Sequence, residues 1–104
     1  SHGEHRLLEM AMALATQPAL LLLDEPAAGL GPEETTAMVA ILRGLRQDKG
    51  ILLVEHDMDV VFAIADRITV MVSGRTIATG SPEEIREDEN VRKAYLGDGV
   101  DEGA

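Results

Sequence analysis

Four leucines, residues 20–23, run directly into two adjacent carboxylates, Asp24 and Glu25, and then into Pro26. A leucine run is stabilised by burial, whereas neighbouring charged side chains oppose it. The whole apolar run, residues 19–23, is too short for a helix and does not alternate, which suits a strand buried on both faces. The sequence therefore predicts a buried strand that emerges at a charged site.

A second apolar run, residues 51–54, ends in the same way, in Glu55 and His56. Between the two runs, Gly31 and Pro32 are typical of a helix start, and the helix should continue to about residue 47. A strand, a helix and a second strand predict an α/β fold with parallel strands joined by a crossover helix. Ligands of such sheets bind outside the carboxyl ends of the strands, where both charged pairs would lie.

The remaining elements follow from similar signals. We expect a helix over residues 4–16, before the first strand, a helix over residues 57–65 capped by Asp57, and a hairpin over residues 68–78 that turns about Ser73 and Gly74. Residues 81–84 form a capping box that predicts a helix start with Ser81 as the cap, and a last short helix should span residues 89–96. Residues 1–97 are expected to form one part of an α/β domain, and residues 98–104 a flexible acidic tail.

Composition narrows the possible partners. The net charge of −10 over 104 residues argues against nucleic acid or anionic lipid as a partner of the bulk surface. The absence of cysteine excludes disulfides and thiolate metal sites. No apolar run approaches the roughly 20 residues of a membrane span, and no signal peptide opens the chain. Because it also begins without methionine, we expect the chain to be a piece of a longer protein.

Three residues at the predicted strand ends suit nucleoside triphosphate hydrolysis. Asp24 could hold Mg²⁺ through its water shell, and Glu25 could act as the general base for an attacking water. His56 could bond both a γ-phosphate oxygen and that glutamate. The simpler alternatives stay open here: strands that end in solvated acids, and an ordinary exposed histidine. Asp57 is better explained as a helix cap than as a catalytic acid.

Ser1, His2 and Gly3 precede the first predicted helix, and Glu4 is its first residue. Small residues leave backbone N–H groups available at the positive end of a helix, which favours an anion. A plain N-cap, or the remnant of a purification tag, would explain the same residues.

Taken together, these motifs resemble the ATP-binding-cassette (ABC) ATPase family over nearly the whole chain, as the C-terminal part of its P-loop NTPase domain. "SHGEH" looks like the end of the signature motif LSGGQ, and "LLLLDE" and "LLVEHD" look like the Walker B and switch-histidine segments. The resemblance implies that Glu25 is the catalytic glutamate, His56 the switch histidine and Asp24 the aspartate on the magnesium side of the site. It also implies that Ser1, Gly3 and Glu4 are signature residues that face the ATP of a partner subunit. Gly29 and Gly31 would belong to the D-loop.

Four longer segments resemble the ATP-binding subunits of branched-chain amino acid importers: "DEPAAGL", "VEHDMDVVFAIADRITVM", "GSPEEIR" and "VRKAYLG". Urea and amide importers have similar C-terminal segments. The resemblance implies ATP and Mg²⁺ as cofactors and a second ABC ATPase subunit and membrane permease subunits as partners, with an external binding protein involved indirectly and no nucleic acid. It places the subunit at the cytoplasmic face of the membrane.

The sequence departs from the family pattern at several positions. His2 stands where glycine is common, Glu4 and His5 replace the glutamine region, and Gly31 stands where the D-loop usually carries aspartate. Glu55 precedes the histidine where a small polar residue is more usual, although this subfamily often has glutamate there.

No G-x-x-x-x-G-K-[ST] phosphate loop occurs in the sequence. We therefore expect this chain alone to lack ATPase activity and the intact protein to have it. Two alternatives remain open: part of a soluble ABC ATPase without a membrane partner, and a non-catalytic interaction module.

Overall fold

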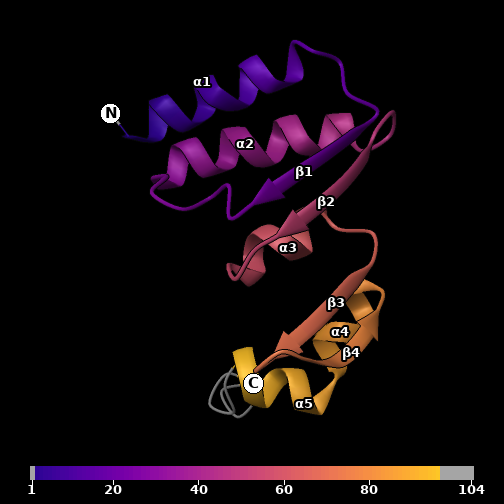
Figure 1. Ribbon diagram of the computed structural model, residues 1–104. Coiled ribbons are helices and arrows are strands. Elements are labelled where there is room, and N and C mark those ends of the chain that lie inside the picture. The colour runs from indigo at the N-terminus through magenta and orange to yellow at the C-terminus, as the bar shows by residue number, and fades with distance from the viewer. Residues whose placement is uncertain (1, 97–104) are drawn as a thin grey trace. The chain divides into compact units, whose positions relative to one another are not determined.

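The computed structural model describes residues 2–96, apart from the side chains of His2 and Leu96 (Figure 1). Ser1 and the predicted acidic tail, residues 98–104, lie outside the described residues. The chain divides into two compact units, residues 1–64 and residues 65–104.

The first unit is built on a two-stranded parallel sheet. β1 (Leu20–Asp24) pairs with β2 (Gly50–Val54), and α2 (Pro32–Leu45) is the connection between them. The predicted α/β class, with parallel strands joined by a crossover helix, is therefore confirmed. Because Asp24 lies opposite Val54 in the register, the carboxyl ends of the two strands lie side by side.

Three helices pack against one face of this sheet: α1 (His2–Leu14), α2 and α3 (Met58–Ile64). Figure 1 shows α1 and α2 lying next to each other. The buried side chains that join the helices to the sheet are all apolar and come from all three helices and from β1; they are Met10, Leu21, Met38, Leu42, Val60 and Ile64. This cluster is the core of the unit and fixes where the strands end.

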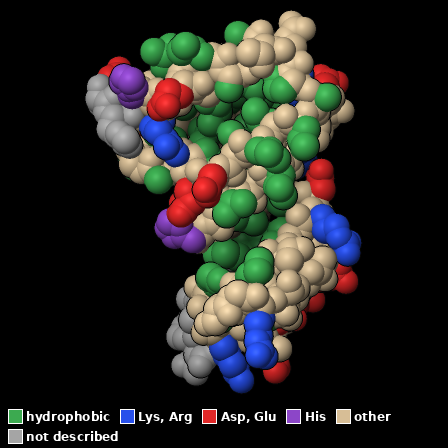
Figure 2. Space-filling view, in the orientation of Figure 1, with side chains coloured by type: hydrophobic (Ala, Val, Ile, Leu, Met, Phe, Trp, Pro, Cys, Tyr) green, Lys and Arg blue, Asp and Glu red, His purple; other side chains and the backbone are tan. Residues whose placement is uncertain are grey.

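The opposite face of the sheet is apolar and exposed (Figure 2). Leu20, Leu22, Leu52 and Val54 are 58%, 64%, 59% and 55% exposed. The expectation of strands buried on both faces is therefore wrong for the described part of the chain. The physical reason is that all three helices of the unit lie on the same side of a two-stranded sheet.

The buried side of α1 is a narrow stripe. Gly3, Leu7, Met10 and Leu14 face the core or lie partly buried against it, whereas Leu8 is 57% exposed. Spacings of three and four residues place the first four positions on one helix face, and Leu8 falls beside that face.

The second unit begins with an antiparallel hairpin of β3 (Ile68–Val72) and β4 (Arg75–Gly80). Ser73 and Gly74 connect the strands with φ values of 50° and 77°. Positive φ at both positions is the geometry of a two-residue hairpin turn whose twist matches the strands. The predicted hairpin is confirmed, and its second strand extends further than expected.

Short helices complete this unit: α4 (Pro82–Glu87), α5 (Glu89–Val91) and a π-helical turn (Arg92–Leu96). Ser81 caps α4 as predicted, because its hydroxyl accepts the Glu84 N–H while the Glu84 carboxylate accepts the Ser81 N–H. These hydrogen bonds, led by the one from the Ser81 backbone, lower the pKa of Glu84. The core of the unit is formed by apolar side chains of the hairpin and the helices, namely Ile68, Val70, Ile85 and Val91.

Candidate functional site

Glu25 lies at the end of β1 in the left-handed backbone region, with φ of 48°. Its N–H donates to the Val54 carbonyl at 2.7 Å, which extends the strand pairing by one residue. Its carbonyl accepts hydrogen bonds from Arg6 Nη2 at 2.7 Å and from the Ala28 N–H at 3.1 Å. Since a non-glycine residue adopts this conformation only when its surroundings enforce it, the three contacts explain how the turn is maintained.

The side chain of Glu25 meets His56 at the end of β2. His56 Nδ1 lies 2.5 Å from Glu25 Oε1, and because an ionised carboxylate only accepts, Nδ1 is the donor. The His56 side chain is 75% exposed and that of Glu25 is 40% exposed. The two strand ends that the sequence predicted to converge therefore join an acid and an imidazole in a pair open to solvent.

Glu55, between the end of β2 and His56, is enclosed, with a side chain that is only 1% exposed. Its Oε2 accepts the Ala27 N–H at 3.1 Å. Its Oε1 accepts the His56 N–H at 3.0 Å and the Asp57 N–H at 3.3 Å, and lies 3.7 Å from His56 Nδ1. Both oxygens are therefore engaged by backbone donors from two different loops.

Glu25, Glu55 and His56 bring candidate ligand atoms within 4.8 Å of one another. This cluster fits Mg²⁺ poorly, because Mg²⁺ prefers oxygen ligands and keeps several waters, while the Glu55 oxygens already accept backbone hydrogen bonds. Asp24, one residue before Glu25, is exposed at the end of β1. A solvated carboxylate at this position fits a cation held through water.

The predicted signature residues lie at the start of α1. Gly3 is buried, and a Cβ at this position would collide with the carboxylate of Glu34, so a larger residue would require the Glu34 side chain to move. Glu4 is exposed, and Ser1 lies outside the described residues. The predicted anion site at this helix end therefore has an acidic side chain from α2 beside it, and the signature role stays a prediction.

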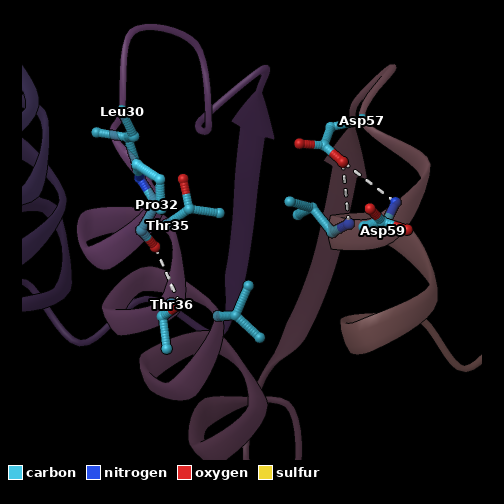
Figure 3. Close-up of a pocket in the computed structure, with 8 residues that line it drawn as sticks. Leu30, Pro32, Thr35, Thr36, Asp57 and Asp59 are labelled. Carbon is cyan, nitrogen blue, oxygen red and sulfur yellow. Dashed lines mark hydrogen bonds between the residues drawn. The ribbon is translucent and has the colours of Figure 1, made fainter.

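The predicted D-loop joins Glu25 to α2. Gly29 has φ of 79°, which glycine adopts without strain, and the Gly31 N–H donates to Glu34 Oε1 at 2.9 Å. Beyond this loop, an open groove of about 450 Å³ separates the first turns of α2 from the start of α3 (Figure 3). Its lining includes both apolar and polar side chains, namely Leu30, Pro32, Thr35, Thr36, Val39, Asp57, Asp59 and Val60.

Figure 3 also shows Asp57 beside the first turn of α3. Its Oδ1 accepts the N–H groups of Asp59 at 3.1 Å and Val60 at 3.4 Å, so the predicted helix cap is confirmed.

The sequence analysis assigned no structural role to two residues of the site, Arg6 and Glu55. The signal for Glu55 was its place directly after a buried strand, next to a candidate histidine. Arg6 offered no such signal, because its contact with the Glu25 carbonyl spans 19 residues and depends on how α1 packs.

The sequence and the fold match known ABC proteins. A family model described as "Branched-chain amino acid ATP-binding cassette transporter" matches residues 75–101. The high-affinity branched-chain amino acid transport ATP-binding protein LivG of Salmonella typhimurium is 48% identical over 100 residues, and BraF of Pseudomonas aeruginosa is 46% identical. Each alignment covers 94% of this chain and 39% of the relative. The crystal structure of MJ1267, an ATP-binding cassette of an ABC transporter, matches with a TM-score of 0.76 and 30% identity, covering 93% of this chain and 40% of MJ1267.

The fold therefore matches that of the ABC ATPase class, and the predicted fold, the C-terminal part of such a domain, is confirmed. Within this class, the predicted resemblance to the ATP-binding proteins of branched-chain amino acid transporters is also confirmed. The chain spans about two fifths of the length of these curated relatives. None of the helices in residues 2–96 combines the length and apolar character needed to cross a membrane.

Proposed function

We propose that this chain is the C-terminal portion of the ATP-hydrolysing subunit of an ABC importer of branched-chain amino acids. The observation that carries the proposal is the Glu25–His56 pair at the ends of two parallel strands, in a chain 46–48% identical to LivG and BraF. The protein that contains this chain together with a further part bearing a phosphate loop is called the whole subunit below.

In the proposed reaction, Glu25 accepts the proton of the attacking water. His56 holds the glutamate in place, because its Nδ1–H occupies one lone pair of Oε1 and leaves the other oxygen for the water. The exposed Asp24 carboxylate would hold Mg²⁺ through its water shell. Mg-ATP would supply the phosphoryl group that the water attacks and the Mg²⁺ charge that stabilises the phosphate oxygens.

The exposed apolar face of the sheet supports the proposal that a further part of the protein is needed. Leu22 and Leu52, each about three-fifths exposed, lie on a sheet face that a folded domain would normally cover. In the whole subunit, the part with the phosphate loop would pack against this face and grip the phosphates that the strand ends approach. The chain alone would then bind ATP weakly and not hydrolyse it.

The remaining roles belong to the assembled transporter. Ser1, Gly3 and Glu4 would face the ATP of a second ABC ATPase subunit, and Gly29 and Gly31 would let the D-loop approach that subunit. The other partners would be membrane permease subunits and, indirectly, an external binding protein. The subunit would sit peripherally on the cytoplasmic face of the membrane.

Replacing Glu25 by glutamine in the whole subunit tests the proposal. Loss of the general base should lower kcat by about 10²–10⁴-fold while ATP binding is retained. Glu33→Gln, which neutralises an exposed carboxylate in the first turn of α2, is the matched control and should keep normal turnover. Unchanged turnover in Glu25→Gln would refute the role given to Glu25.

A further inference from the structure

We propose that Glu55 is a positioning residue for the hydrolytic reaction: its buried carboxylate ties the loop that follows Glu25 to the loop that carries His56. The inference rests on the proposed function, but its structural part can be measured without any turnover.

The two oxygens of Glu55 serve different loops. Oε2 accepts the Ala27 N–H, two residues after Glu25, across 28 positions of sequence. Oε1 accepts the N–H groups of His56 and Asp57, which fix the course of the chain just after β2. A single carboxylate therefore sets the spacing between the backbone segments that present the acid and the imidazole.

The burial of Glu55 distinguishes it from its neighbours. Its side chain is 1% exposed, compared with 40% for Glu25 and 75% for His56. Burying a carboxylate is unfavourable unless its oxygens accept hydrogen bonds, and here both do. A side chain this enclosed is held in one position, and it transmits that position to the two exposed groups beside it.

The conformation of Glu25 shows why positioning is needed. Its φ of 48° is sparsely populated by non-glycine residues, so the turn depends on contacts around it. Glu55 holds the loop at Ala27, and Arg6 holds the Glu25 carbonyl. Without the Glu55 contacts, the 2.5 Å approach of His56 Nδ1 to Glu25 Oε1 would no longer be enforced from both sides.

The chemistry requires a carboxylate rather than a side chain of similar size. Glutamine has a single acceptor oxygen, and its NH₂ group would face either the Ala27 N–H or the His56 and Asp57 N–H groups. Glu55→Gln therefore removes one of the two attachments while keeping the volume, and Glu55→Ala removes both.

The kinetic test uses the whole subunit with Glu55→Gln, Glu55→Ala and the matched control Glu84→Ala. Glu84 also accepts one backbone N–H, that of Ser81 at the start of α4. This hydrogen bond does not involve the loops that carry Ala27 or His56. We expect kcat to fall by about 10-fold or more in both Glu55 variants, with the KM for ATP within about threefold of wild type, because displacing a reacting group by about 1 Å can cost about 10²-fold in rate even when the mutated residue does not touch the substrate. Glu84→Ala should leave both constants unchanged.

The spectroscopic test records the imidazole nitrogens of ¹⁵N-histidine-labelled whole subunit by NMR, with His56 assigned by His56→Gln. In wild type, Nδ1 should carry the proton, as its contact with Glu25 requires. In Glu55→Gln, the Nδ1 signal should move toward its unprotonated position. The two proposals can therefore fail separately. A wild-type whole subunit that has no ATPase activity would refute the proposed function. The positioning role would be refuted by an unchanged Nδ1 signal in folded Glu55→Gln, or by an unchanged kcat in both Glu55 variants.

Discussion

Leu22 gives a quantitative test of whether a further part of the protein covers the exposed sheet face. Leu22 is 64% exposed and its neighbour Leu21 is 6% exposed, and the two point to opposite faces of β1. Burying a whole leucine contributes about 1.5–3 kcal/mol, so the roughly one-third of Leu22 that is buried contributes about 0.5–1 kcal/mol. A fully buried leucine replaced by alanine costs about 2–5 kcal/mol.

In the whole subunit, Leu22→Ala should therefore lower the unfolding free energy by about 2–5 kcal/mol if a further part of the protein covers the face, and by under about 1 kcal/mol if the face stays exposed. Leu21→Ala is the matched control and should cost about 2–5 kcal/mol in either case, because Leu21 belongs to the core. Urea unfolding of the three proteins, followed by circular dichroism, measures the difference. A cost below about 1 kcal/mol for Leu22→Ala, beside a full cost for Leu21→Ala, would refute the covered face.

Two further predictions concern helix starts. The pKa of Glu84 is lowered because the Ser81 backbone N–H and then the Ser81 hydroxyl favour the charged form, so its contribution to stability is complete above about pH 4.5 and is lost as the pH falls through the lower folded-state value. The difference in urea midpoint between wild type and Glu84→Gln should therefore shrink between pH 6 and about pH 3.5; a constant difference would contradict the reasoning. Asp57→Ala removes the cap that binds the Asp59 and Val60 N–H groups and should cost about 0.5–2 kcal/mol in unfolding free energy; Asp57→Asn, which keeps an acceptor oxygen, should cost less, and equal losses would argue against capping.

Much of the site's location could be predicted from the sequence, because strand order fixes it. Two apolar runs ending in charged residues, with a helix between them, leave parallel pairing as the simplest arrangement, and that pairing brings the ends of β1 and β2 together. The contact between Glu25 and His56 follows from this backbone arrangement. The cap at Asp57 and the hairpin at Ser73 were predictable because local hydrogen bonding decides them.

The features that escaped prediction depend on tertiary packing. The sequence of β1 reads as buried on both sides, yet which face is covered depends on where the helices lie, and Leu22 remains exposed. Glu55 resembles the solvated acids beside it, and only its enclosure distinguishes it. Arg6 reaches Glu25 through the packing of α1, which no local pattern encodes.

In the proposed function, this chain carries the hydrolytic residues of an ABC ATPase but lacks the loop that binds the phosphates. Isothermal titration of Mg-ATP into the 104-residue chain and into the whole subunit tests it most directly. We expect saturable binding of Mg-ATP by the whole subunit, and binding by the chain that is too weak to saturate. Saturable binding of Mg-ATP by the 104-residue chain, at an affinity similar to that of the whole subunit, would contradict it.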